Sequence, residues 1–211
     1  MGPQVEPDYV YSDSSAEIAK AMLDLLSADR HDTSTPNRPQ TNGTIERTVR
    51  KVKEGITALL LQAGANPEWW ADAMRCFCFL HNVMDLLWDG STAYEKRFDD
   101  FYTGPEIPFM AEVEYKPSAP KVKNQMHPFG SKLLPGLFVG YYQRPGGLWG
   151  GDLFFVDWEE VERAERVSEI PVRRIKAKEV FPKLCNSKCR FPLAEGVRTQ
   201  PTPALRNRPL T

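Results

Sequence analysis

The sequence lacks any long hydrophobic run. No apolar stretch approaches the roughly 18 residues that a membrane-spanning helix requires. The first residues, MGPQVEPDYVYSD, also lack the charged start and apolar run of a signal peptide. We therefore expect an intracellular protein without a membrane partner, and the nucleus is a candidate compartment.

Cysteine is scarce, and its spacing excludes a zinc ribbon. The four cysteines form one CxC pair, Cys76 and Cys78, and one CxxxC pair, Cys185 and Cys189. Zinc-ribbon knuckles use other spacings. Cys76 and Cys78 fall in a helical pattern two positions apart, so they point in different directions. We expect all four to be ordinary reduced thiols.

The sequence has no excess of either charge, since 27 basic and 28 acidic residues give a net charge of −1. Total charge therefore implies no partner. The distribution is uneven: residues 61–120 carry 4 basic and 10 acidic groups, whereas residues 171–211 carry 10 and 2. A basic end of this kind binds nucleic acid or other anions, or is simply a soluble disordered tail.

Two helices are predicted in the first half, at residues 44–64 and 67–87. The first has one apolar stripe and a plausible C-cap at Gly64. The second has Asn66 as N-cap followed by Pro67. The two should pack together, with the faces around Leu59 and Trp70 largely buried. A shorter helix is expected over residues 93–98.

After Gly104 the pattern changes to short strands. Four β-prone segments are separated by Pro, Gly and charged connectors: 109–115, 137–142, 152–157 and 170–175. Four or five short strands in this length predict a small barrel. From Pro182 onward the sequence is rich in Pro and Arg and poor in large apolar residues, which predicts disorder.

Glu46, in the first turn of the helix at 44–64, is the first candidate site residue. The helix dipole favours a carboxylate there, so surface charge is one interpretation. Arg50 and Lys53 follow on the same stripe behind a loop that contains Gly43, and this combination suits a metal ion beside a phosphodiester. Asp13 is a second candidate ligand, because it ends a strand-like run and strand ends line the sites of open α/β sheets.

At these residues the chain resembles the integrase of copia-type LTR retrotransposons. YSDSSAEI matches the motif of the family's second catalytic Asp, at Asp13, and RPQTNGTIER matches its PxxNGxxER motif, with Asn42, Gly43, Glu46 and Arg47. PEWWADAMRCFCFLHN, STAYEKRF and GLFVGYY resemble later family segments. The resemblance covers about residues 9–182.

The resemblance implies an α+β chain in three parts. Residues 1–103 correspond to a truncated RNase H-like α/β core with long helices, residues 104–182 to a small SH3-like β-barrel, and residues 183–211 to a disordered basic tail. It implies Asp13 and Glu46 as catalytic residues and ligands of Mg²⁺ or Mn²⁺, with their carboxylates close enough to share an ion. It implies Asn42, Arg47, Arg50 and Lys53 as DNA contacts. DNA is the expected partner, and other integrase or polyprotein segments are further candidates.

The family uses three acidic residues, and the first has no match among the twelve residues before Asp13. Asp8 is five positions away along one strand and faces the other side. We expect a fragment of a retrotransposon polyprotein that binds nucleic acid. Its family activity is DNA integration by a Mg-dependent polynucleotidyl transferase, and this chain should be inactive alone. The alternatives are a non-catalytic DNA- or protein-binding module and a decayed reading frame.

Overall fold

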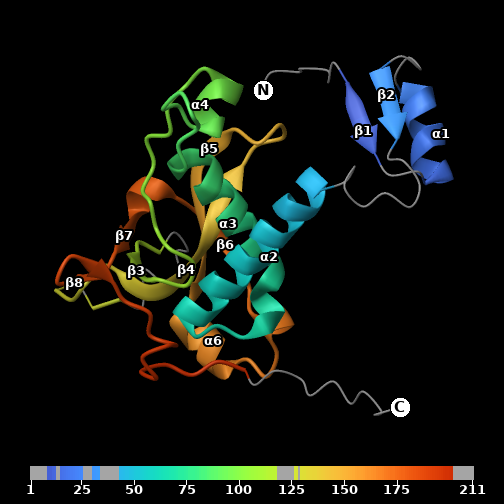
Figure 1. Cartoon of the computed structure of the whole chain (residues 1–211). Coiled ribbons are helices and arrows are strands. Elements are labelled where there is room, and N and C mark those ends of the chain that lie inside the picture. The colour runs from blue at the N-terminus through green and yellow to red at the C-terminus, as the bar shows by residue number, and fades with distance from the viewer. Residues whose placement is uncertain are drawn as a thin grey trace, which may run out of the picture. The chain divides into compact units, whose positions relative to one another are not determined.

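The computed structural model describes residues 9–12, 15–25, 30–33, 43–117, 126–127 and 129–201. The fold is α+β, as expected (Figure 1). The described residues form two compact units that divide between Lys53 and Glu54. The domain boundaries expected at 103/104 and 182/183 stay a prediction.

The first unit contains a β-α-β element. Strand β1 (Val10–Ser12) and strand β2 (His31–Thr33) are parallel, with Val10 opposite His31 and Ser12 opposite Thr33. Helix α1 (Ala16–Leu25) connects them. Helix α2 (Gly43–Ala63) begins in this unit and continues into the second. Parallel strands need a crossover connection, and α1 supplies it.

The turn after α2 follows the predicted caps. Gly64 has φ +64°, and the amides of Gly64 and Ala65 donate to Leu61 and Leu60 carbonyls at 3.2 and 2.9 Å, which closes the helix end. The Asn66 side chain accepts from the Glu68 amide at 2.9 Å and so caps the next helical segment. That segment consists of a 3-10 turn, η3 (Pro67–Trp69), and helix α3 (Trp70–Met84).

The predicted buried face of α3 was wrong by one position. Trp69 is buried, whereas Trp70 is 56% exposed. The buried positions are Ala73, Cys76, Phe79 and Val83. Small side chains let the helix approach the sheet closely: a Cβ atom built on Gly140 would lie 4.0 Å from that of Cys76.

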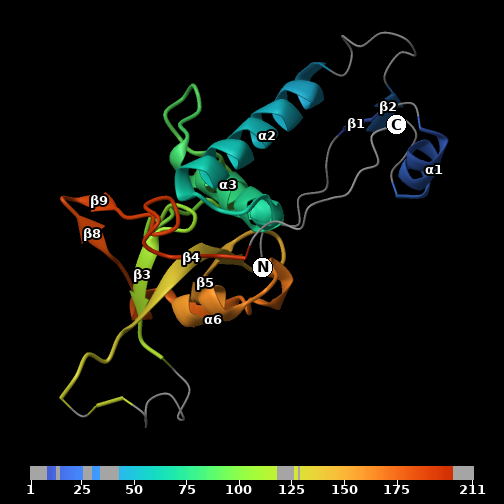
Figure 2. The same cartoon turned by 90° about the horizontal axis from the view of Figure 1, so that it is seen from below.

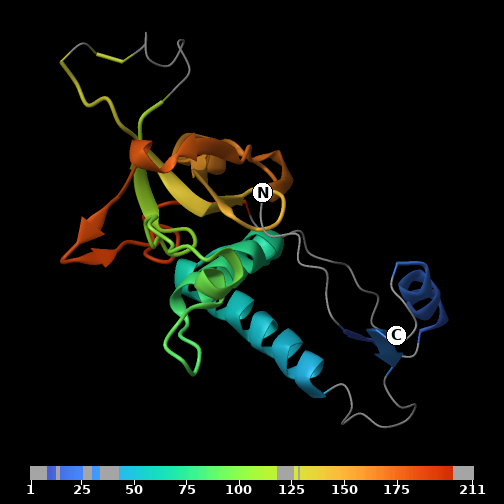
Figure 3. The same ribbon diagram turned by 90° about the horizontal axis from the view of Figure 1, so that it is seen from above.

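The second unit contains a five-stranded antiparallel sheet in the order β6-β5-β4-β3-β7. Its strands are β3 (Glu112–Tyr115), β4 (Leu134–Gln143), β5 (Trp149–Asp157), β6 (Arg173–Lys176) and β7 (Val180–Pro182). Helix α4 (Ala93–Phe98) precedes it, and α6 (Trp158–Arg163) and the 3-10 turn η4 (Val167–Glu169) join β5 to β6. In Figures 2 and 3, α3 and α6 lie on opposite sides of β4 and β5.

The sheet is strongly curled. Its outer strands β6 and β7 are joined only by the 3-10 turn η5 (Ala177–Glu179). Four residues of chain span at most about 14 Å, whereas the outer strands of a flat five-stranded sheet lie about 19 Å apart. Register shifts in β4 beside Gly140 and before Gln143 bend the sheet.

The expected closed barrel is not formed by the described residues. Each strand pairs in a row, and β6 and β7 remain its two edges. Both strands are short, and η5 links them along the chain without pairing them. The result is a curled, open sheet.

The residues from 183 to 201 are ordered, which corrects the prediction of a disordered tail there. Strands β8 (Leu184–Cys185) and β9 (Lys188–Cys189) form a hairpin. Glu112 fixes both of its ends, because its backbone carbonyl accepts from the Lys183 amide and its amide donates to the Arg190 carbonyl. Residues 202–211 lie outside the described residues.

The segment after the hairpin returns to the α2–α3 turn. Leu193 is buried, and the Gln200 side chain donates to the Gly64 carbonyl and accepts from the Asn66 amide at 2.9 Å. The Asn66 side chain donates to the Pro201 carbonyl at 3.0 Å. Although this segment has few apolar residues, its hydrogen bonds to the buried α2–α3 turn hold it in place.

This contact predicts that replacing Gly64 or Gly196 by Ala destabilises the fold to different extents, although both glycines have a similar positive φ. At Gly64 an added Cβ would lie 2.6 Å from the backbone of Ala194, whereas at Gly196, φ +68°, it would meet nothing within 4 Å. We expect Gly196→Ala to lower the free energy of unfolding by about 1 kcal/mol through backbone strain alone. Gly64→Ala should cost about 3 kcal/mol, because overpacking is added. Urea denaturation measures both, and equal costs would contradict the packing.

Candidate functional site

The carboxyl end of β1 is where the first candidate ligand was predicted. β1 ends at Ser12, directly before Asp13 in the sequence. The Ser12 Oγ lies 2.9 Å from Nε2 of His31 on the neighbouring strand. Asp13 itself lies outside the described residues. The strand end that should present it is therefore confirmed, and its role as ligand stays a prediction.

Glu17, the second acidic residue of the same motif, lies in the first turn of α1. Its carboxylate accepts a hydrogen bond from the Ser15 hydroxyl at 2.7 Å. This bond, followed by the backbone amide of Glu17, lowers the pKa of the carboxyl. Glu17 is therefore an ionised helix-start residue that already has a local partner.

Helix α2 carries the second candidate ligand and three of the predicted DNA contacts. Glu46 is in its first turn and is exposed, and Arg47, Arg50 and Lys53 are exposed on later turns. Positions 46, 50 and 53 share one stripe because they are four and three residues apart. The remaining predicted DNA contact, Asn42, lies outside the described residues.

The donor set fits a hard divalent cation in its chemistry, because carboxylate oxygens are the ligands that Mg²⁺ prefers. Within the described ranges, no three or more His, Cys, Asp or Glu side chains are grouped so as to hold a metal. Asp13 lies outside these ranges. Binding of Mg²⁺ or Mn²⁺ by Asp13 and Glu46 therefore stays a prediction.

Much of the basic charge expected to attract phosphate is paired within the fold. Arg174 and Lys176 of β6 lie 2.5 and 2.6 Å from the carboxylate of Asp152, which is 3% exposed. Lys183 lies 2.9 Å from the carboxylate of Glu112, which is 1% exposed. The uneven charge seen in the sequence therefore overstates what a phosphate backbone would meet.

Asp152 was not recognised from the sequence, although it organises this surface. Burial alone would raise the pKa of its carboxyl, but hydrogen bonds from Lys176 and Arg174 outweigh burial and lower it. The Arg174 guanidinium also lies 3.4 Å from the ring centroid of Tyr142. The only signal was an acid in a strand of otherwise apolar and glycine residues, GGDLFFV.

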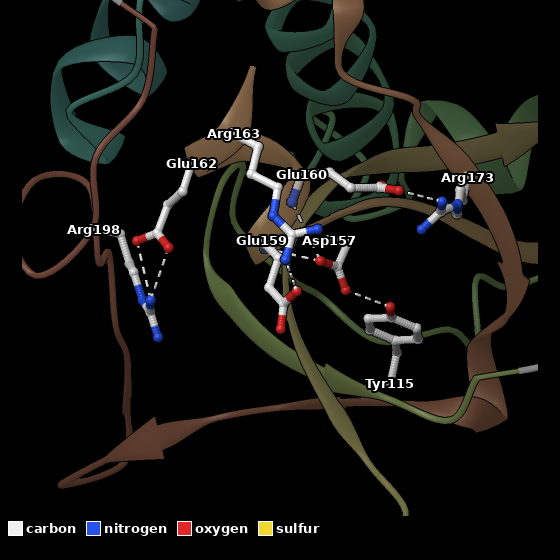
Figure 4. A network of polar contacts seen from close by, with 8 residues as sticks. All are labelled: Tyr115, Asp157, Glu159, Glu160, Glu162, Arg163, Arg173 and Arg198. Carbon is white, nitrogen blue, oxygen red and sulfur yellow. Dashed lines mark hydrogen bonds and ion pairs between the residues drawn. The ribbon is translucent and has the colours of Figure 1, made fainter. Parts of the chain in front are cut away.

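A second polar network lies around the start of α6 (Figure 4). The Asp157 carboxylate caps α6 by accepting from the Glu159 amide at 2.8 Å, and it accepts from the Tyr115 hydroxyl at 2.6 Å. Burial, and then this hydrogen bond, raise the pKa of Tyr115. Arg173 pairs with Glu160 at 2.5 Å. These groups line a hollow of about 590 Å³, whose carboxylates make it unsuitable for phosphate.

Helix α6 also contacts the C-terminal segment through Glu162 and Trp158. Both nitrogen–oxygen contacts of Arg198 with Glu162 are short, at 3.0 and 3.1 Å (Figure 4). The Arg198 guanidinium also lies 3.9 Å from the ring centroid of Trp158. Arg198 therefore has a structural role and is not available as a DNA contact.

The Asp152 pairs predict a pH-dependent loss of stability. Because the folded-state pKa of Asp152 lies below its unfolded value, its contribution is present above the unfolded pKa and is lost as pH falls through the folded pKa. We expect Asp152→Asn to lower the free energy of unfolding by about 1–3 kcal/mol at pH 7. The difference from the unsubstituted protein should shrink below about pH 4.

Denaturation at several pH values measures this effect. Glu159→Gln is the matched control, since it breaks an exposed pair with Arg163 at 2.7 Å and should change stability by less than about 0.5 kcal/mol. An Asp152→Asn effect that is independent of pH would contradict the ionic interpretation.

The chain is similar in sequence to part of a retrotransposon polyprotein. No family model matches the chain. Over 124 residues, or 57% of its length, it is 27% identical to the retrovirus-related Pol polyprotein from transposon TNT 1-94 of Nicotiana tabacum. The match spans 9% of that polyprotein, so the chain corresponds to a small part of it.

One solved structure is weakly similar to this chain. A chain in the cryo-electron microscopy structure of the simian T-cell lymphotropic virus intasome, in complex with the PP2A regulatory subunit B56 gamma, matches 85% of this chain and 59% of its own length. The identity is 16% and the TM-score 0.37, which is too low to establish a shared fold. Among the residues that the structure describes, no helix combines the length and apolar character needed to cross a bilayer.

Proposed function

We propose that this chain is an integrase-derived segment of a retrotransposon polyprotein that binds nucleic acid. The observation that carries the proposal is the β-α-β element, whose first strand ends directly before Asp13, together with the exposed Glu46 in the first turn of α2. The similarity to a retrotransposon Pol polyprotein supports the same origin. The activity of the family that it resembles is DNA strand transfer.

The finer proposal is a copia-type integrase whose two units derive from different domains. The parallel β1–β2 pair with its crossover helix α1 is consistent with part of an RNase H-like sheet. The curled sheet, in which a 3-10 turn links its two edge strands, is consistent with an opened SH3-like domain. Both assignments rest on element order and the sequence motifs.

Asp13 and Glu46 are the residues that would hold Mg²⁺ or Mn²⁺. When bound, such ions activate a water or a DNA 3′-hydroxyl and stabilise the leaving oxygen. The family takes its ligands from three positions, and these residues supply two of them. Two carboxylates are too small a donor set for a two-metal site.

Nucleic-acid binding would use the exposed cations of α2. Arg50 and Lys53 lie on the stripe that begins at Glu46, and Asn42 and Arg47 belong to the motif beside it. Phosphate contacts require positive charge and little geometry. Binding can therefore persist in a chain that does not catalyse strand transfer.

With only two of the three family ligands, we expect an inactive chain. Residues 1–211 should give no 3′-end processing and no strand transfer on a matched LTR DNA end with Mg²⁺ or Mn²⁺. Two ions about 3.5–4 Å apart need a bridging carboxylate, and two ligands hold at most one weakly bound ion. A gel assay with labelled DNA measures both reactions, and DNA binding by the same preparation is the control. Strand transfer that disappears on Glu46→Gln would show that another carboxylate completes the site.

If the cations of α2 contact phosphate, DNA binding should be sensitive to salt. Arg50→Ala combined with Lys53→Ala should weaken duplex DNA binding and reduce the slope of log affinity against log salt by about 2. Fluorescence anisotropy at several salt concentrations measures the slope.

The matched control is Lys116→Ala combined with Arg163→Ala, which removes the same charge from exposed positions on β3's end and α6. Its slope should be unchanged. An equal reduction by both double variants would show that binding depends on net charge and not on α2.

A further inference from the structure

A hollow of about 230 Å³ lies between α3, α4 and the β4–β5 turn. Two aromatic rings of α4, Tyr94 and Phe98, form its apolar side, and three side chains from three different elements form its polar side: Asn82, Arg97 and Gln143. The volume is below that of sites for drug-sized ligands. A ligand that fills it is therefore small, such as one ring system.

The aromatic side is held rigidly. Tyr94 is 5% exposed, its ring centroid lies 4.8 Å from that of Phe98, and its hydroxyl accepts from the Trp149 amide at 3.3 Å. A complete capping box between Thr92 and Glu95 fixes the start of α4. Rings fixed before binding lose little entropy when a flat ligand packs on them.

The polar side has unused hydrogen-bonding capacity. Asn82, Arg97 and Gln143 are exposed, and within the described part of the chain their side chains take part in no hydrogen bond or ion pair. The Arg97 guanidinium lies 5.5 Å from the Phe98 ring centroid. A Cβ atom built on Gly147 would lie 3.7 Å from both the Gln143 Oε1 and the Phe98 ring. The Gln143 amide and the Phe98 ring therefore border the same space.

The charge of this hollow distinguishes it from its neighbours. None of its lining residues is acidic. The hollow beside α6 contains Asp157, Glu159 and Glu160, and another beside β4 contains Asp72. The α4 hollow alone among these three therefore combines aromatic rings, amides and a cation without a repelling carboxylate.

We propose that this hollow binds a single unpaired nucleobase of a nucleic acid, an inference that rests on the proposed nucleic-acid binding. Aromatic side chains stack on bases, Asn and Gln pair with base edges through two hydrogen bonds, and Arg97 can reach the attached phosphate. A base inside a duplex is not accessible to such a hollow. The ligand is therefore single-stranded, at an end or a displaced strand.

Mononucleotides test the hollow directly. In an NMR titration, the four deoxynucleoside 5′-monophosphates should shift the ring signals of Tyr94 and Phe98, whereas deoxyribose 5-phosphate, which lacks the base, should not. Asn82→Ala combined with Gln143→Ala should weaken nucleotide binding about tenfold, because base-edge contacts are lost. Both positions are exposed, and circular dichroism checks that the variant folds.

A charge-matched pair separates the hollow from general electrostatics. Arg97→Ala should weaken binding of a short single-stranded oligonucleotide more than Arg144→Ala, which removes the same charge from an exposed turn residue outside the hollow. The difference between the two variants should disappear on an abasic oligonucleotide of the same length.

The outcomes separate this inference from the proposed function. Oligonucleotide binding that is indifferent to abasic substitution and equal in both arginine variants overturns the base site and leaves nucleic-acid binding intact. No binding of duplex or single strands overturns the proposed function. The base site is also overturned if mononucleotides shift NMR signals elsewhere in the protein and leave the ring signals of Tyr94 and Phe98 unchanged.

Discussion

The second unit depends on the packing of Tyr141 of β4 against α3. Its ring stacks on Phe79 at 4.4 Å, and its hydroxyl both donates to the Ile107 carbonyl and accepts from the Ile107 amide, at 3.0 and 2.7 Å. Burial strongly raises the pKa of the phenol, so it stays protonated. One side chain thus joins helix, sheet and the segment before β3, and it closes this contact without leaving a buried polar group unpaired.

The same packing positions the surfaces that carry the proposed functions. Because α3 lies close to β4 at Gly140, α4 and the β4–β5 turn meet at the edge of the aromatic cluster that surrounds Phe79. The hollow with the free amides is a consequence of this meeting. The buried acids Asp152 and Glu112 meanwhile pair with Lys176 and Lys183 of the C-terminal region.

Local signals predicted the elements well, and long-range contacts decided what they missed. Gly64 and Asn66 act through neighbours in the chain, so their caps were predictable from the sequence. Trp69 is buried instead of Trp70 because of the short 3-10 turn before α3 and because small residues of α3 pack against the sheet. A helical period alone does not contain that information.

The candidate site residues could be predicted only where they belong to a recognisable sequence motif. The structure confirms that β1 ends before Asp13 and that Glu46 is in the first turn of α2, and both follow from the residues nearby. The ordered segment up to 201 and the pairing of Arg174 with Asp152 join positions distant in sequence. Composition predicted disorder for residues 183–201, which was wrong because polar contacts at a buried turn order this segment. It also could not show that buried acids pair with the basic residues of this region.

The contact between Asn66 and Gln200 joins residues 134 positions apart. A ribosome makes the α2–α3 turn early, yet the groups that complete it emerge almost at the end of these 211 residues. Until Gln200 is made, the Asn66 amide lacks the acceptor that it has in the folded chain. Closing so long a loop carries an entropic cost. The segment around Gln200 thus determines whether the α2–α3 turn is completed. A frameshift or stop codon shortly before Gln200 would leave every predicted site residue in place and still weaken the fold that carries them.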